Sequence, residues 1–267
     1  MTAKGLDLNP PDPNGIGKSA AIVTGASSGL GRATAHLVAN AGRPVAVWGR
    51  NEERTEQVAE ECRALGVEAV GVPFDIGDQA AVVDAVATSE KALGKIGGLA
   101  MCHGIGPLGA FGDLNFDTLE ECLRTNLTSL AYSIEAALPV LRKAGRGAAI
   151  VAALSTASLR STHIMPQYAA SKHGALGLIR AAARALGPEG IRANAVCPGA
   201  MDTPMMEAGL STASDDREAF KQAMIAAIPL GYISNPLEVA EVVYFMIAPQ
   251  SSYVNGADIA VDGGMIV

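Results

Sequence analysis

A tyrosine and a lysine stand four residues apart, at Tyr168 and Lys172, in a stretch whose apolar residues recur at helical spacing. Side chains at positions i and i+4 share one face of a helix, so the phenol and the ammonium group would lie side by side. A phenol with a pKa near about 10 is a weak base at neutral pH, but a nearby cation lowers that pKa. The pair is therefore a candidate for proton exchange with an alcohol or a carbonyl oxygen.

Ser155 follows an apolar run, residues 148–154, that we expect to be a buried strand. In open parallel sheets, ligands bind beyond the carboxyl ends of the strands. The Ser155 hydroxyl could hold the substrate oxygen beside the phenol. A Tyr-x-x-x-Lys pair also arises by chance, so its weight depends on what accompanies it.

A glycine-rich turn joins the first expected strand, residues 20–24, to the first expected helix, residues 29–40. It reads Thr-Gly-Ala-Ser-Ser-Gly-Leu-Gly over residues 24–31. Glycines allow a tight turn close to a pyrophosphate, whose charge the N-terminus of the helix attracts. The spacing differs from the general G-x-G-x-x-G fingerprint, and such a turn can also be a simple connection. The residues expected to bind a dinucleotide here are Gly25, Ser27, Ser28, Gly29, Leu30 and Gly31.

The elements that would position these residues follow from the alternation of short apolar runs with alanine-rich helical stretches. This alternation predicts an α/β fold: a doubly wound, Rossmann-type parallel sheet, flanked by helices on both faces, in a single domain. After the first strand, further strands are expected at 44–48, 67–74, 99–102, 148–154, 192–197 and 258–261. After the first helix, further helices are expected at 52–65, 79–93, 116–143, 168–186 and 237–247.

Two segments fall outside this pattern. Residues 1–17 are rich in proline, asparagine, glycine and aspartate, which indicates a flexible tail before a catalytic domain at 18–267. Residues 201–234 are polar and rich in methionine, and we expect a lid-like segment over the site. A helical surface packed on its own domain would give the same pattern.

The composition excludes several classes of partner. The net charge of −7 and the absence of Lys/Arg clusters argue against nucleic acid and anionic membranes. The sequence holds no run of about 20 apolar residues and no signal-peptide pattern, so we expect no membrane association. The four cysteines are widely separated, which predicts reduced thiols in the cytoplasm and no metal site.

With these residues in hand, the sequence resembles the short-chain dehydrogenase/reductase family from about residue 18 to residue 267. The resemblance rests on the turn at 24–31, on Asn126 in Arg-Thr-Asn-Leu, and on Tyr-Ala-Ala-Ser-Lys ending at Lys172. Ser155 also precedes Tyr168 by thirteen residues, as in the family. Later signatures are Pro-Gly-Ala-Met-Asp-Thr at residues 198–203 and Asp-Gly-Gly at residues 262–264.

The resemblance implies a role for each catalytic residue. Tyr168 would be the proton donor and acceptor, and Ser155 would orient and polarise the carbonyl. Lys172 would bind the nicotinamide ribose and lower the phenol pKa, and Asn126 would hold a water in a proton relay. Taken alone, Asn126 could equally be a polar helix residue with a backbone bond.

The resemblance also implies cofactor contacts away from the turn. Asp75 and Ile76 would contact the adenine, and Thr203 the nicotinamide end. Without the resemblance, Asp75 would be a helix cap and Thr203 a turn residue. Further cofactor contacts are expected from Gly104, Pro198 and Gly199, besides Tyr168 and Lys172.

One departure from the family is plain. Where the family commonly has Asn-Asn-Ala-Gly, this chain has Met101, Cys102, His103 and Gly104. His103 could face the cofactor or the substrate, but a lone histidine is more often structural or solvated. The sequence assigns it no role.

The choice of nicotinamide depends on the residues that come directly after the second strand. An NAD-preferring site usually places Asp or Glu there to bind the ribose 2′-OH, whereas this chain has Arg50 and Asn51. The Arg50 guanidinium suits a 2′-phosphate, which predicts NADP as the cofactor. An arginine at a helix start can also be simply exposed, in which case NAD could still bind.

The sequence leaves the substrate open beyond a small-molecule alcohol or carbonyl compound. A scaffold or sensor that binds the cofactor without catalysis would lack Tyr168, Lys172 or Ser155, all of which are present. An epimerase or dehydratase of the extended relatives would have a longer C-terminal domain. The resemblance further implies a homo-oligomer, a tetramer or a dimer, with the apolar residues 263–267 at a subunit contact.

Overall fold

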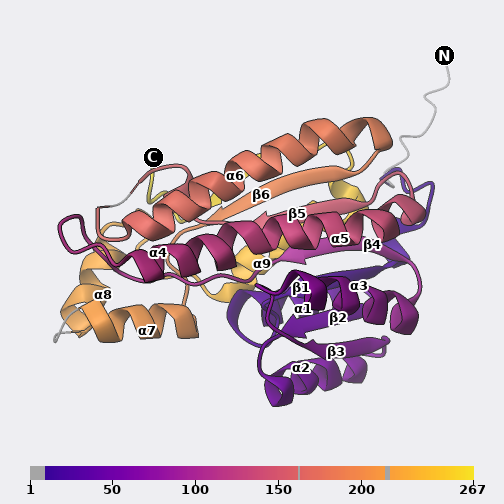
Figure 1. Cartoon of the computed structure of the whole chain (residues 1–267), viewed down its shortest axis with the longest axis horizontal. Helices are drawn as coiled ribbons and strands as arrows, with labels where there is room; N and C mark the ends of the chain where they lie inside the picture. The colour runs from indigo at the N-terminus through magenta and orange to yellow at the C-terminus, as the bar shows by residue number, and fades with distance from the viewer. Residues whose placement is uncertain (1–9, 162, 214–216) are drawn as a thin grey trace.

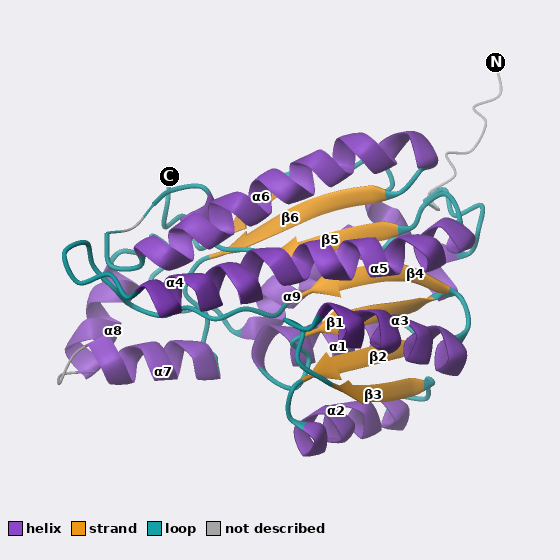
Figure 2. Cartoon of the chain, in the orientation of Figure 1, coloured by secondary structure: helices purple, strands orange, loops and turns teal. Residues whose placement is uncertain are grey.

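The structure, a computed structural model, describes residues 10–161, 163–213 and 217–267. Within them, a seven-stranded sheet has the strand order β3-β2-β1-β4-β5-β6-β7, and every neighbouring pair is parallel. The strands are β1 (Ala20–Thr24), β2 (Val45–Gly49), β3 (Ala69–Pro73), β4 (Ile96–Met101), β5 (Ala149–Ala153), β6 (Arg192–Pro198) and β7 (Asp258–Val261). The expected doubly wound fold is confirmed (Figures 1 and 2).

Helices cover both faces of this sheet. They are α1 (Gly29–Asn40), α2 (Glu52–Ala64), α3 (Gln79–Leu93), α4 (Phe116–Leu123), α5 (Ser129–Ala144), α6 (Pro166–Leu186), α7 (Pro204–Ala213), α8 (Arg217–Ala226) and α9 (Pro236–Ile247). One core holds buried side chains of α3, α5 and α6, and the other holds those of α1, α2 and α9. Figure 2 shows α3, α5 and α6 in front of the strands, with α9 behind them.

The central strands β2, β4 and β5 carry no polar side chain because both faces of the sheet are covered there. In β5, Ile150 and Ala152 face one core while Ala149 and Val151 face the other. Successive side chains of a strand point to opposite faces, so an unbroken apolar run serves both layers.

The order of the strands reverses at β1. This strand pairs with β2 on one side and with β4 on the other. After β1, the chain adds β2 and β3 on the first side of the sheet and then adds β4 and the later strands on the second side. The carboxyl ends of β1 and β4 therefore frame a crevice in which such folds bind ligands.

The sequence predicted one helix over residues 116–143, and the structure divides it. A π-helical turn, Arg124–Thr128, separates α4 from α5. A π turn widens the helix locally and often occurs at functional sites, and the sequence carries no periodic signal for it.

The fourth strand begins at Ile96, three residues before its predicted start. Gly97 and Gly98 argue against a strand by composition, but close packing explains them. A Cβ on Gly97 would lie 2.3 Å from the hydroxyl oxygen of Ser19, and one on Gly98 would lie 3.2 Å from the Ala21 Cβ.

The boundary expected at residue 17 lies too late in the chain. The Asp12 carboxylate accepts hydrogen bonds from the backbone N–H groups of Ile16 and Gly17, at 2.6 and 2.9 Å. Ile16 is 1% exposed and belongs to the core. Residues 12–17 therefore pack on the domain, whereas residues 1–9 of the expected tail lie outside the described residues.

The segment at 201–234 contains α7 and α8 and is closed at its base by a bridge between Met201 and Ser234. Figure 1 shows the two helices beside one another, beyond the ends to which the strand arrows point. This is the position expected for a lid-like segment; residues 214–216 of it lie outside the described residues.

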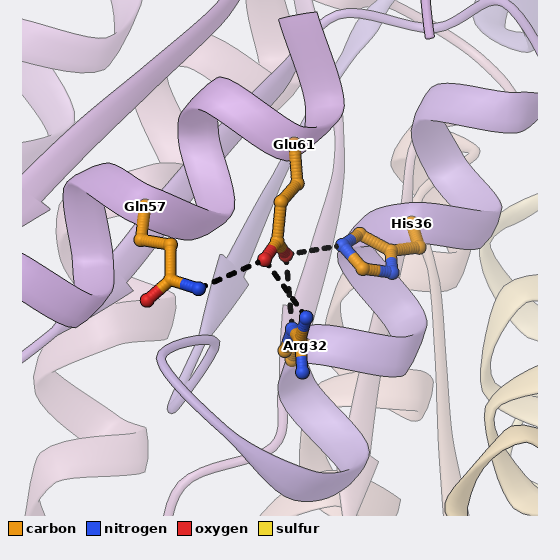
Figure 3. A network of polar contacts seen from close by, with 4 residues as sticks. All are labelled: Arg32, His36, Gln57 and Glu61. Carbon is orange, nitrogen blue, oxygen red and sulfur yellow. Dashed lines mark hydrogen bonds and ion pairs between the residues drawn. The ribbon is translucent and has the colours of Figure 1, made fainter. Parts of the chain in front are cut away.

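A polar network joins the helices on either side of the glycine-rich turn (Figure 3). Arg32 of α1 donates two hydrogen bonds to the carboxylate of Glu61 in α2, at 2.8 and 2.9 Å. His36 and Gln57 complete the shell around the same carboxylate. The hydrogen bonds from Arg32 hold the pKa of Glu61 below its usual range, and the shared carboxylate links α1 to α2.

Candidate active site

A cleft of about 610 Å³ opens at the carboxyl ends of the strands. It brings together residues that are far apart in the sequence. Those predicted from the sequence that line it are Gly25, Ser27, Ser28, Gly29, Leu30, Gly31, Arg50, Asn51, Asp75, Ile76, Gly104, Tyr168, Lys172, Pro198 and Thr203. Three predicted residues do not line the cleft: Ser155, Asn126 and Gly199.

The glycine-rich turn is compact enough that two of its positions admit only glycine. Gly25 has φ 62°, and a Cβ on it would lie 2.7 Å from the Cα of His103. A Cβ on Gly31 would lie 2.3 Å from the carbonyl oxygen of Gly25. The turn can therefore bring its backbone N–H groups close to a ligand.

The N-terminus of α1 faces the cleft without a capping side chain. Ser28, its N-cap residue, makes no side-chain capping bond, whereas Asn51 and Asp78 cap α2 and α3. The first N–H groups of a helix have no partner within the helix and carry partial positive charge. The turn thus fits a pyrophosphate.

Two arginines line the part of the cleft next to β2. Arg50 follows β2, as predicted, and Arg54 lies one helical turn further on, in α2. Arg54 was not predicted, because its place in the cleft depends on how the first turn of α2 packs there. The Asn51 side chain accepts a hydrogen bond from the Arg54 N–H at 2.8 Å, so it is engaged in capping.

Asp75 follows β3 and is not the cap of α3, a role that Asp78 fills. Its carboxylate accepts a hydrogen bond from the Gly77 N–H at 3.0 Å and forms an ion pair with Arg124 at 3.1 Å. The bond from Gly77 and the Arg124 guanidinium hold the pKa of Asp75 below its usual range. Asp75 is therefore a fixed anionic acceptor at this end of the cleft.

The candidate catalytic pair, Tyr168 and Lys172, lies at the start of α6, on one face of the helix, as its spacing predicted. Pro166 begins the helix, Tyr168 follows in the first turn, and Lys172 is one turn later. The Lys172 Nζ donates to the carbonyl oxygen of Ala153 at 3.2 Å and lies 5.6 Å from the centre of the Tyr168 ring. Ser155 hydrogen bonds to the Tyr168 hydroxyl, which places it beside the cleft lining.

Burial dominates the titration of both groups. It raises the pKa of Tyr168 to about 12, against which the hydrogen bond from Ser155 acts. It lowers the pKa of Lys172 to about 8. The lowering of the phenol pKa that we expected from Lys172 is not found in the chain alone, where burial of the phenol dominates.

Asn126 is fully buried in the π turn and binds the segment after β4. Its Oδ1 accepts from the Ile105 N–H at 2.8 Å, and its Nδ2 donates to the Ile105 carbonyl at 2.9 Å and to the Ser171 hydroxyl at 3.0 Å. These bonds give Asn126 the backbone-bonded role that the sequence left open.

Gly199 and Thr203 follow β6. A Cβ on Gly199 would lie 2.8 Å from the Cβ of Asp262, so this glycine allows the chain to pass the Asp-Gly-Gly segment. The Thr203 hydroxyl accepts from the Met206 N–H at 3.3 Å, in the first turn of α7. Thr203 therefore combines a position in the cleft with the turn role considered from the sequence.

Thioether side chains cover the phenol on the side of the lid-like segment. A Cβ added to Gly106 would lie 3.3 Å from Met165 Cε, 3.4 Å from Met205 Sδ and 3.7 Å from Tyr168 Cε2. The space beside the phenol ring is therefore bounded by glycine backbone and two apolar, flexible side chains. Met205 belongs to the expected lid-like segment at 201–234, whereas no sequence pattern had singled out Gly106 or Met165.

The described residues hold neither a metal-ligand cluster nor a membrane-spanning helix. They contain no cluster of three or more His, Cys, Asp or Glu side chains that could ligate a metal ion. None of their helices combines the length and the apolar character needed to cross a bilayer.

The sequence is similar to known proteins over nearly its whole length. Residues 25–266 match a family described as Enoyl-(Acyl carrier protein) reductase. L-rhamnose 1-dehydrogenase (NAD(P)(+)) of Azotobacter vinelandii is 35% identical over 92% of this chain and 96% of its own length. 2,5-dichloro-2,5-cyclohexadiene-1,4-diol dehydrogenase of Sphingobium indicum is 31% identical over 95% of this chain and 98% of its own. The crystal structure of a short-chain type dehydrogenase/reductase from Mycobacterium marinum has a TM-score of 0.84 and 28% identity, covering 93% of this chain and 95% of that one.

Proposed function

The chain belongs to the short-chain dehydrogenase/reductase family, and on that premise we propose that it is an NADP(H)-dependent oxidoreductase acting on an alcohol/carbonyl pair, with Tyr168 as the general acid/base. One observation carries the proposal. Tyr168 and Lys172 line the same cleft as the glycine-rich turn, and Ser155 lies beside the Tyr168 hydroxyl. A dinucleotide lying along the cleft would reach both.

The bound cofactor would supply a nicotinamide ring that accepts or donates the hydride. In alcohol oxidation, Ser155 would hold the substrate oxygen while ionised Tyr168 takes the hydroxyl proton. Lys172, held by the Ala153 carbonyl, would stabilise the phenolate across the 5.6 Å to its ring. In reduction, the Tyr168 hydroxyl would return the proton to the carbonyl oxygen.

A substrate panel read by nicotinamide absorbance tests this assignment. We expect the parent chain to oxidise or reduce at least one compound, and Tyr168→Phe to lose at least about 10³-fold in kcat because the proton-transfer group is absent. Tyr253→Phe, at a fully exposed tyrosine, is the matched control and should keep full activity. Turnover by Tyr168→Phe at the parent rate would refute the role of the phenol.

The preference for NADP rests on Arg50, supported by Arg54. Both arginines line the part of the cleft next to β2, where the two residues directly after the strand, Arg50 and Asn51, carry no carboxylate. A 2′-phosphate would form charge-assisted hydrogen bonds with them. We expect Arg50→Ala to lower kcat/KM with NADP by about 10- to 100-fold and to change kcat/KM with NAD much less. Equal kcat/KM for the two cofactors in the parent chain would refute the preference.

The thioether-lined space beside Tyr168 supports an apolar cyclic or branched substrate. A sugar would need several polar partners in that space, whereas Gly106, Met165 and Met205 offer none from their side chains. Among the relatives, the cyclohexadienediol dehydrogenase is named for a ring substrate and the rhamnose dehydrogenase for a sugar. We expect higher kcat/KM with cyclic secondary alcohols than with L-rhamnose; the reverse order would contradict this.

A protein that binds the cofactor without catalysing would bind NADPH and turn over nothing in the panel. We further propose a homo-oligomer, a tetramer or a dimer, working in the cytoplasm. The mass by light scattering tests the first point. The free state of Cys62, Cys102, Cys122 and Cys197 supports the second.

A further inference from the structure

His103 lies at the floor of the cleft, in the position where the family commonly has an alanine, and the proposed reaction gives it no task. Its side chain is 9% exposed and lies between the end of β1 and the start of α5. One ring nitrogen, Nδ1, is 2.5 Å from the Thr24 hydroxyl. The other, Nε2, is 2.7 Å from the Ser129 hydroxyl.

The neighbouring bonds determine which nitrogen carries the proton. The Ser129 hydroxyl donates its only hydrogen to the Thr125 carbonyl at 2.6 Å, so toward His103 it can only accept. His103 therefore donates from Nε2. Nδ1 then accepts from the Thr24 hydroxyl, whose oxygen in turn accepts from the Cys102 N–H at 3.2 Å. The result is a directed chain of bonds in which every polar atom has a partner and the imidazole is neutral.

The electrostatic surroundings agree with this assignment. Burial lowers the pKa of His103 to about 3, and the charge of nearby Lys172 acts in the same direction. A neutral ring can accept at one nitrogen and donate at the other, whereas a protonated ring can only donate. The two bonds are thus available together across the neutral pH range.

The two ends of this chain belong to different parts of the site. Thr24 is the last residue of β1 and begins the phosphate-binding turn, and the next residue, Gly25, packs directly on the His103 backbone. Ser129 is the first residue of α5 and follows the π turn that holds Asn126. The imidazole therefore spans from the cofactor-binding turn to the turn that supports the catalytic residues.

We propose that His103 is a positioning residue whose neutral imidazole sets the phosphate-binding turn with one nitrogen and the π turn of Asn126 with the other. The inference rests on the proposed function. Loss of the hydrogen bond to Thr24 should weaken NADPH binding, and loss of the hydrogen bond to Ser129 should slow turnover.

Two conservative substitutions separate the ends. In His103→Gln the amide nitrogen can replace Nε2, so the bond to Ser129 is kept and the acceptor for Thr24 is lost. In His103→Asn the amide oxygen can replace Nδ1, so the bond to Thr24 is kept and the bond to Ser129 is lost. His103→Leu removes both, and His36→Gln, in the network of Figure 3, is the control outside the cleft.

NADPH affinity is measured by fluorescence titration, which needs no turnover, and kcat is measured with the best substrate of the panel. We expect His103→Gln to raise the NADPH Kd at least about fivefold with kcat within about twofold, and His103→Asn to do the reverse, because a hydrogen bond is worth about that factor. His103→Leu should show both changes, and His36→Gln neither. Circular dichroism identifies any variant that fails to fold; the two amide variants then decide the question.

A ring that only fills the core would behave differently. The variants would lower the melting temperature alike and leave the NADPH Kd within about twofold of the parent, which would overturn the inference. Equal changes in Kd and kcat for the Gln and Asn variants would also overturn it. If no substrate is turned over, the proposed function fails. The comparison of the NADPH Kd of His103→Gln with that of His103→Asn still decides this inference, because the titration needs no turnover.

Discussion

Acid should destabilise this protein through one buried histidine. Burial lowers the pKa of His103 to about 3 in the folded state, whereas an unfolded histidine titrates near about 6.5. As the pH falls below about 6.5, the unfolded chain binds a proton that the folded chain does not. The free energy of unfolding therefore decreases toward acid, over the window between these two pKa values.

The magnitude follows from the same two pKa values. The unfolded state gains about 1.4 kcal/mol for each pH unit below its pKa, and the folded state gains almost nothing until about pH 3. Between about pH 7.5 and about pH 5, His103 alone should remove roughly 2 kcal/mol from the free energy of unfolding. The bonds to Thr24 and Ser129 oppose protonation because a protonated ring has no acceptor for Thr24.

Urea unfolding of the parent and of His103→Gln at the two pH values measures this contribution. All measurements use one protein concentration, because the stability of an oligomer depends on concentration. Carboxylates titrate in both proteins and cancel in the double difference. We expect the parent to lose about 2 kcal/mol more than the variant, and His163→Gln, at an exposed position, to follow the parent. An equal loss in parent and His103→Gln would show that the ring is protonated or rearranged in the folded state.

Three further predictions concern the frame of the site. Gly31→Ala should raise the NADPH Kd more than about tenfold, measured by fluorescence titration, because its Cβ would lie 2.3 Å from the Gly25 carbonyl oxygen. Gly177→Ala, in open space in α6, should instead stabilise the folded protein by about 0.5 to 1 kcal/mol, measured by thermal melts. Arg192→Met should cost about 3 kcal/mol in thermal unfolding, because the buried guanidinium binds the last carbonyls of α9 and they would lose their partners; a stability equal to the parent would contradict this. Glu61→Gln should cost less than about 1 kcal/mol, and the difference should shrink in 1 M salt, because the network is partly exposed.

The sequence predicted the strands well because both faces of the sheet are covered. An apolar run with no polar interruption has few other places in a soluble domain, so β1 and β7 were predicted to the residue. The start of β4 was predicted too late, because Gly97 and Gly98 are explained only by side chains that approach from Ser19 and Ala21. Such contacts depend on tertiary packing, which spacing in the sequence does not report.

The catalytic pair was predictable for a related reason. Tyr168 and Lys172 lie within one helix, whose geometry fixes their relation from spacing alone. Arg54 and Met165 were missed because their positions depend on how α2 and the loop before α6 meet the cleft. The expected effect of Lys172 on the phenol failed similarly, since a distance alone does not include the cost of burial.

The reversal of strand order at β1 divides the site into two halves with different tasks. The chain from β1 to β3 supplies the glycine-rich turn, Arg50 and Asp75, which would hold the adenosine half of a dinucleotide. The chain from β4 onward supplies the candidate catalytic residues. The two halves meet along β1 and β4, so their relative position depends on the few side chains that cross this boundary. His103 crosses it with a bond on each side, so loss of both bonds in His103→Leu should reach both cofactor binding and turnover, whereas loss of one bond should reach only one of them.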